Sequence, residues 1–217
     1  MQFHCAAILF DLDGVLVNSI AVVERQWRLW AIRHGLDPEQ VIQVAHGHRT
    51  VETVAIVLPD GDHAAEAAAV ERAEIEDISG LTAGAGAAQL IAKLPANRWG
   101  VVTSGTRALA TARLRAVGLP LPMQMVPADE VSKGKPDPEP YLKGASLLGV
   151  PAKDCLVFED APTGVRAAKA AGMRVFGIPG TCEAKDLSHA DGIVAGLSEV
   201  DVSPNADGLL VRVGREA

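Results

Sequence analysis

The chain has 217 residues, of which 48% are hydrophobic and 22% are charged. This length and composition favour one large folded domain, or a domain with one insertion, over a disordered chain. The net charge of −7 argues against nucleic acid or an anionic membrane as a partner, although it leaves room for a small anionic ligand held by a few local cations.

The cysteines and the hydropathy pattern indicate a cellular compartment. Cys5, Cys155 and Cys182 are widely spaced and form no CxxC pair, so neither a disulfide framework nor a zinc site is favoured. Cys5 and Cys155 border apolar runs, where we expect them to be buried. No apolar segment approaches the roughly 20 residues that span a bilayer, and no leader pattern begins the chain. We therefore expect a cytoplasmic protein.

Apolar segments of strand length recur along the chain. They lie at 6–10, 98–103, 123–126, 155–159 and 174–178, with weaker ones at 192–194 and 208–213. After the second of them, helical patterns separate the strands, at 106–117, 138–148 and 162–171. This alternation predicts an α/β fold with a parallel sheet that is covered on both faces. The segment from Asp201 to Asp207 is predicted to be a loop before the last strand.

Residues 11–97 contain no strand-like pattern, and a connection of that length needs an explanation. Amphipathic or alanine-rich helical stretches fill it, near 20–34, 38–45, 50–57 and 63–77. We predict an all-helical cap domain over 15–82, inserted into a core domain formed by 1–14 and 83–217. Because the insertion begins just after Asp13, the cap should stand over the carboxyl ends of the strands, where open α/β sheets bind ligands.

Acidic residues follow two of the predicted strands. Asp11 and Asp13 lie two residues apart at the end of the first strand, so their side chains can project toward the same space. Two such carboxylates repel each other unless a cation lies between them. The Asp11 carboxylate, a backbone carbonyl at Asp13, and Asp160 are the predicted ligands of Mg²⁺, with Glu159 as a further ligand or acting through water.

The remaining polar groups complete what phosphoryl transfer needs. Asp11 can attack phosphorus in line and form an aspartyl-phosphate, while Asp13 can protonate the leaving alcohol and then deprotonate water. Ser104 and the amide of Gly105 follow the second strand and can donate hydrogen bonds to the phosphate. Lys135, in a loop rich in glycine and proline, can supply a positive charge at the same place.

The motifs DLDGVLV, VTSG, KGKPDPEPY and FEDAPTGV together resemble, in order, the four motifs of the haloacid dehalogenase superfamily. The resemblance covers essentially the whole chain. It implies a Rossmann-like core with a helical cap, Mg²⁺ as the cofactor and a phosphorylated Asp11.

Within the predicted cap, the segment HGHRTVET at 46–53 resembles the corresponding segment of the 2-deoxyglucose-6-phosphate and glycerol-3-phosphate phosphatases. This similarity implies a phosphatase that acts on small sugar or polyol phosphates. Arg49 could then reach the phosphate or the hydroxyls of the substrate, since guanidinium suits oxygen-rich ligands. A surface ion pair on a cap helix is the alternative role for Arg49.

Other activities stay open. A β-phosphoglucomutase-type isomerase shares the cap and the four motifs, but that branch carries a histidine at the position of Val23 and a cap lysine, whereas residues 1–92 here contain no lysine. A phosphoglycolate phosphatase is a further alternative. A haloacid dehalogenase lacks the second acid, Asp13, and a phospho-accepting receiver domain is shorter and has no helical insertion. We expect the protein to be a monomer.

Overall fold

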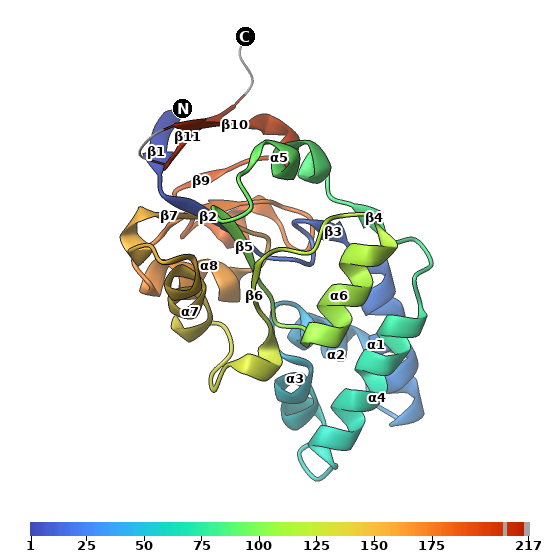
Figure 1. The fold of residues 1–217 in the computed structure, drawn as a ribbon. Coiled ribbons are helices and arrows are strands. Elements are labelled where there is room, and N and C mark those ends of the chain that lie inside the picture. Colours follow the sequence, from blue (N-terminus) through green and yellow to red (C-terminus); the bar gives the residue numbers. More distant parts are fainter. Residues whose placement is uncertain (206–207, 215–217) are drawn as a thin grey trace.

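A parallel sheet of six strands forms the centre of the molecule (Figure 1). The computed structural model describes residues 1–205 and 208–214, and it confirms the predicted α/β class. The strand order is β6-β5-β2-β7-β8-β9. Their bounds are β2 (Ala7–Phe10), β5 (Trp99–Val102), β6 (Gln124–Val126), β7 (Cys155–Glu159), β8 (Arg174–Gly177) and β9 (Gly192–Ile193). β2 lies between two neighbours, so its entirely apolar sequence is buried on both faces.

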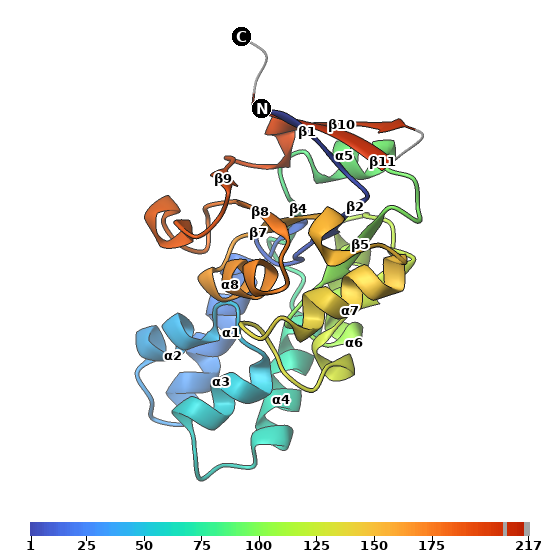
Figure 2. The same ribbon diagram turned by 90° about the vertical axis from the view of Figure 1, so that its left-hand side faces the viewer.

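Helices cover the two faces of this sheet (Figure 2). α7 (Glu139–Leu148) and α8 (Pro162–Ala170) pack on the face to which Leu9 points. α5 (Ala87–Lys93) and α6 (Arg107–Ala116) pack on the opposite face, which receives Ile8 and Phe10. Alternate residues of one strand therefore belong to two separate apolar clusters. Short 3₁₀ helices occur at Ala128–Glu130, Ala152–Asp154, Ala184–Leu187 and Leu197–Glu199.

A second, antiparallel sheet corrects one sequence prediction and adds a strand that the sequence did not predict. It contains β1 (Gln2–Cys5), β11 (Gly208–Val213) and β10 (Val200–Asn205), in that order. The loop predicted from Asp201 to Asp207 is wrong over the residues that β10 includes, and residues 206 and 207 lie outside the described part. Val200 and Val202 face the apolar cluster, and pairing with β11 outweighs the low strand propensity of the polar residues between and after them. β1 was not predicted.

Four helices beyond the carboxyl ends of the strands form what we call the helical group: α1 (Ile20–Arg33), α2 (Pro38–Ala45), α3 (Thr50–Val57) and α4 (His63–Glu76). The group has an apolar cluster of its own, in which Trp27 and Trp30 are buried. The chain enters and leaves it through β3 (Val17–Asn18) and β4 (Thr82–Ala83), which pair with each other. The domain division at 15–82 stays a prediction.

The cysteines are free, and Cys5 and Cys155 are buried as predicted. Within residues 1–205 and 208–214, no helix combines the length and the apolar character that crossing a bilayer requires.

Candidate active site

The carboxyl ends of the central strands bring the predicted polar residues together. Asp11 follows β2, and its amide donates to the carbonyl of Phe158 in β7 over 3.0 Å. Thr103 follows β5, and its amide donates to Val126 in β6 over 3.0 Å. Pairing between strands thus continues past the strand ends, which places the site on rigid backbone. Glu159 ends β7, and Asp160 follows it; both are buried.

Lys135 lies at the centre of this cluster. Its Nζ donates to Asp11 Oδ1 over 2.5 Å, to Glu159 Oε1 over 2.6 Å and to the carbonyl of Val102 over 3.2 Å. Burial disfavours its charged form, but the two carboxylates outweigh burial and raise the pKa of the ammonium. Lys135 therefore stays charged and balances part of the negative charge that the strand ends concentrate.

The Glu159 carboxylate is held on both oxygens. Besides Lys135, the hydroxyl of Tyr141 donates to Oε1 over 2.9 Å, and the amide of Ala161 donates to Oε2 over 2.9 Å. Gly164 in α8 leaves the space for this carboxylate, because a Cβ atom there would lie 1.6 Å from Oε1. Glu159 is thus fixed by its surroundings and in turn fixes the position of Lys135.

Three buried carboxylates in this cluster fit a metal site. Asp11, Glu159 and Asp160 each offer an oxygen, and these oxygens lie within 4.8 Å of one another. Burial, reinforced by the neighbouring carboxylates and opposed by Lys135, raises the pKa of Asp11 to about 7 and that of Asp160 well above its usual range. A hard divalent cation with oxygen ligands, such as Mg²⁺, would relieve this repulsion. The side chain of Asp13 lies outside the group.

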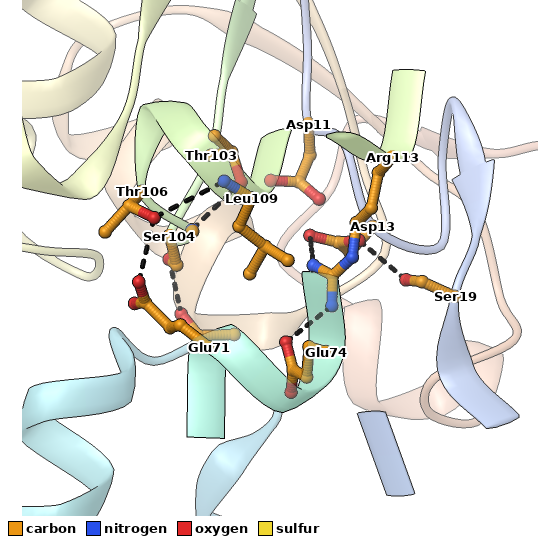
Figure 3. Close-up of polar contacts among 12 residues, drawn as sticks. Asp11, Asp13, Ser19, Glu71, Glu74, Thr103, Ser104, Thr106, Leu109 and Arg113 are labelled. Carbon is orange, nitrogen blue, oxygen red and sulfur yellow. Dashed lines mark hydrogen bonds and ion pairs between the residues drawn. The ribbon is translucent and has the colours of Figure 1, made fainter. Parts of the chain in front are cut away.

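Asp13 is held instead by two donors (Figure 3). The hydroxyl of Ser19 donates to Oδ1 over 2.6 Å, and Arg113 Nη1 lies 2.8 Å from Oδ2. Arg113 comes from α6 and also pairs through Nη2 with Glu74 of α4, over 2.7 Å. Arg113 and Glu74 are 3% and 4% exposed. A chain of charges therefore runs from the partly exposed Asp13 through buried Arg113 to Glu74 in the helical group.

Sequence reasoning missed Arg113 and Glu74, although their helices carry a signal for each. In α6, Arg113 lies four residues after buried Leu109 and three after buried Ala110. In α4, Glu74 lies four residues after buried Val70. At helical spacing both charged side chains therefore lie on the apolar stripe. A charged residue in such a stripe indicates a buried partner.

The loop between α2 and α3 contacts the predicted phosphate-binding residues. The carbonyl of Gly47 accepts from Ser104 Oγ over 3.1 Å and from Thr163 Oγ1 over 3.3 Å. Gly47 has φ +77°, and a Cβ atom there would lie 2.3 Å from Thr163 Oγ1, so only glycine permits this approach. The amide of Gly105 donates to Thr103 Oγ1 over 3.0 Å. The phosphate-binding roles of Ser104 and Gly105 stay predictions.

Arg49 lies apart from this cluster. Its guanidinium pairs with Glu52, at 2.5 Å from Oε1, and Nη1 donates to the carbonyl of Val131 over 3.3 Å. It thereby joins α3 to the loop that carries Lys135, and it is not among the residues that line the pocket. Its predicted role in substrate selectivity stays a prediction.

The helical group encloses a pocket over the strand ends. Its lining includes Asp11, Asp13, Ser104, Arg113 and Glu74, and its volume is about 80 Å³. Pockets that hold small organic ligands typically measure about 300–1,000 Å³. The space between the helical group and the strand ends in this structure is therefore smaller than such ligands typically occupy.

Comparisons with known proteins agree with this geometry. The family model described as haloacid dehalogenase-like hydrolase matches residues 5–172. Hexitol phosphatase A of Escherichia coli (strain K12) is 39% identical over 94% of this chain and 98% of its own length. Glycerol-1-phosphate phosphohydrolase 2 of Saccharomyces cerevisiae is 38% identical over 81% of this chain and 75% of its own length.

A solved structure shares the fold. The structure of CbbY from Rhodobacter sphaeroides in complex with phosphate superposes with a TM-score of 0.79, at 25% identity, over 90% of this chain and 96% of that one. The extent of the family match and the identity to full-length relatives confirm the predicted superfamily. The chain belongs to the haloacid dehalogenase-like hydrolases.

Proposed function

We propose that this protein is a Mg²⁺-dependent phosphatase that hydrolyses small sugar or polyol phosphates through a phosphorylated Asp11. The names of the two phosphatase relatives support the reaction and the substrate class. The single observation that carries the proposal is the position of Asp11: it lies at the end of the central strand, 2.5 Å from Lys135 and within the carboxylate group.

Asp11 is oriented for attack on phosphorus. Lys135 holds its Oδ1, and among the described residues no hydrogen bond reaches Oδ2. Attack by Oδ2 forms a bond to phosphorus while the bond from phosphorus to the ester oxygen breaks. Water then cleaves the aspartyl-phosphate, which releases inorganic phosphate and restores Asp11.

Asp13 would transfer the protons of both steps. Ser19 and Arg113 fix its two oxygens, so the carboxyl group keeps one orientation between the steps. It donates a proton to the departing alcohol and later accepts one from the attacking water. Its place two residues after Asp11 lets both side chains reach the same phosphoryl group.

Asp11, Asp160 and the backbone carbonyl of Asp13 would hold Mg²⁺, with Glu159 as a direct ligand or one acting through water. When bound, the ion supplies positive charge that offsets the charge of the phosphoryl oxygens. Ser104, Gly105 and Lys135 would bind the same oxygens. Ser104 must then exchange its bond to Gly47 for one to the phosphate.

A phosphate-release assay tests the proposal. The screen covers hexitol, hexose and glycerol phosphates and phosphoglycolate, each with Mg²⁺ and with EDTA. We expect Mg²⁺-dependent release from polyol or sugar phosphates, and a loss of at least about 10³-fold in kcat for Asp11→Asn. Asp60→Asn makes the same chemical change at an exposed position and serves as the control. Release by Asp11→Asn at the wild-type rate would refute the phosphorylated intermediate.

The isomerase alternative has its own readout. Val23, which stands where the isomerase branch carries a histidine, lines the pocket and offers no group that titrates. Formation of glucose 6-phosphate from β-glucose 1-phosphate, without release of phosphate, would favour the isomerase.

A further inference from the structure

The ion pair between Arg113 and Glu74 leaves two polar atoms without hydrogen-bond partners. Arg113 Nε is fully buried and has no hydrogen-bond partner. Nη1 contacts Asp13 and Nη2 contacts Glu74 Oε2, so Nε is the guanidinium nitrogen whose N–H has no acceptor. In the described part of the chain, no hydrogen bond reaches Glu74 Oε1 either. Both residues line the pocket.

These two atoms are complementary to a hydroxyl group. In the planar guanidinium, Nε–H and one Nη2–H lie on the same edge, so an oxygen that accepts from Nε lies beside the Glu74 carboxylate. A hydroxyl can accept from Nε–H and donate to Oε1 at the same time. A carboxylate or phosphate cannot, because it has no proton to donate to Oε1 and would bring a negative charge against the Glu74 carboxylate.

A purely structural role explains the pair poorly. The same two helices are already joined by Glu71, whose Oε2 accepts from Thr106 Oγ1 over 2.8 Å (Figure 3). Burying an ion pair costs desolvation that the attraction between the partners often fails to recover. Burial indeed raises the pKa of Glu74 to about 7, against the opposing effect of Arg113. A buried ion pair that costs desolvation free energy and lies beside the pocket is suited to binding a ligand.

The location of the pair formed by Arg113 and Glu74 determines which hydroxyl of a substrate the pair can reach. Arg113 Nη1 is 2.8 Å from Asp13 Oδ2, and Asp13 is the group that would protonate the departing oxygen. The guanidinium therefore lies one hydrogen-bond step from that oxygen. A hydroxyl on the carbon next to the ester carbon, or one carbon further, falls within its reach.

We propose that Arg113 and Glu74 form a hydroxyl-recognition subsite, which favours monophosphates with a hydroxyl one or two carbons from the ester and rejects those with a second anionic group there. This inference rests on the proposed phosphatase activity and names the feature of the substrate that the site selects. It separates polyol and sugar phosphates from phosphoglycolate by charge.

The test removes the hydroxyls from the substrate and, separately, the carboxylate from Glu74. Values of kcat/KM are measured for glycerol 1-phosphate, for n-propyl phosphate, which lacks the hydroxyls, and for phosphoglycolate. The enzymes are wild type, Glu74→Gln, and the control Glu71→Gln, which removes a carboxylate from the same helix outside the pocket. A hydrogen bond to a charged group contributes about 1.5–3 kcal/mol, so we expect wild type to prefer glycerol 1-phosphate over n-propyl phosphate by at least about tenfold.

In Glu74→Gln we expect this preference to fall by about tenfold, and the ratio of phosphoglycolate to glycerol 1-phosphate activity to rise by at least as much. Glu71→Gln should keep both ratios within about twofold of wild type. If Glu74→Gln lowers kcat/KM equally for all three compounds, the pair only positions Asp13 and the inference is wrong. Wild-type enzyme without any preference for glycerol 1-phosphate over n-propyl phosphate refutes it as well, and that readout needs no variant to fold.

The failure of the proposed function looks different. It would appear as no phosphate release by wild type from any compound in the screen, with or without Mg²⁺. Release from glycerol 1-phosphate and n-propyl phosphate at equal efficiency would leave the phosphatase standing and remove the subsite alone.

Discussion

Glu74→Gln should change how the stability of the protein depends on pH. Burial, opposed by Arg113, raises the pKa of Glu74 from 4.5 to about 7. Between these two values the folded state binds a proton that the unfolded state has lost, so ionisation of Glu74 destabilises the fold as pH rises. Stability from this group is fully present below about pH 4.5 and is lost as pH rises through about 7. Glutamine does not ionise and lacks this dependence.

The size of the effect follows from the shift. A difference of 2.5 units between 4.5 and about 7 corresponds to about 3 kcal/mol at about 1.4 kcal/mol per unit. The unfolded state is already partly ionised at about pH 5, so the part expressed between about pH 5 and pH 8 is about 2–3 kcal/mol. The free energy of unfolding of Glu74→Gln, minus that of wild type, should rise by this amount across the interval.

Urea denaturation at several pH values, in EDTA and at constant ionic strength, measures this difference. Changes at the metal site affect both proteins alike, so they cancel when the two are subtracted. Glu71→Gln provides the control, since Glu71 is only partly buried and its removal should give a difference that varies by less than about 1 kcal/mol. Parallel curves for wild type and Glu74→Gln, or a difference that falls with pH, would show that Arg113 outweighs burial and would refute the reasoning.

Two further predictions concern the carboxylate cluster. Lys135→Met leaves Asp11 and Glu159 buried without their cation, so in EDTA near pH 7.5 the free energy of unfolding should fall by about 3–5 kcal/mol. Added Mg²⁺ should recover part of this loss, measured by thermal denaturation. No response to Mg²⁺ would contradict a metal site there. Gly164→Ala would place a Cβ atom 1.6 Å from Glu159 Oε1. We therefore expect the free energy of unfolding, measured by urea denaturation, to fall by about 1–3 kcal/mol and kcat to be lower. Wild-type values for both would show that the carboxylate can move aside.

The fold and the central cluster could be predicted from sequence because both depend on local patterns. Buried strands such as β7 read as continuous apolar runs, and the polar residues at their ends, Asp11 and Asp160 among them, mark the edge where parallel strands meet. β10 was missed because its partner and its apolar neighbours, which lie elsewhere in the chain, decide its conformation. The polar residues of such a hairpin read as a loop when they are taken alone.

The link between Asp13, Arg113 and Glu74 could not be predicted for a related reason. Arg113 and Glu74 are 39 residues apart, and they meet only because α4 packs against α6. Each helix by itself shows no more than a charged residue within an apolar stripe. Arg49 shows the converse case: its motif drew attention to the substrate, whereas its contacts are with Glu52 and the backbone of the Lys135 loop.

The ribbon of β3 and β4 has a consequence for how the pocket admits a ligand. Val17 pairs with Ala83 and Asn18 with Thr82, so the two connections to the helical group are joined to each other by backbone pairing at one point. We expect two connections paired in this way to let the helical group move as one unit about the pairing point. Gly47 and Glu74 both belong to the helical group, so a movement that takes Gly47 away from Ser104 would also take Glu74 away from Arg113, which would keep its contact with Asp13. Entry of the substrate and a change in the charges around Asp13 would then occur together.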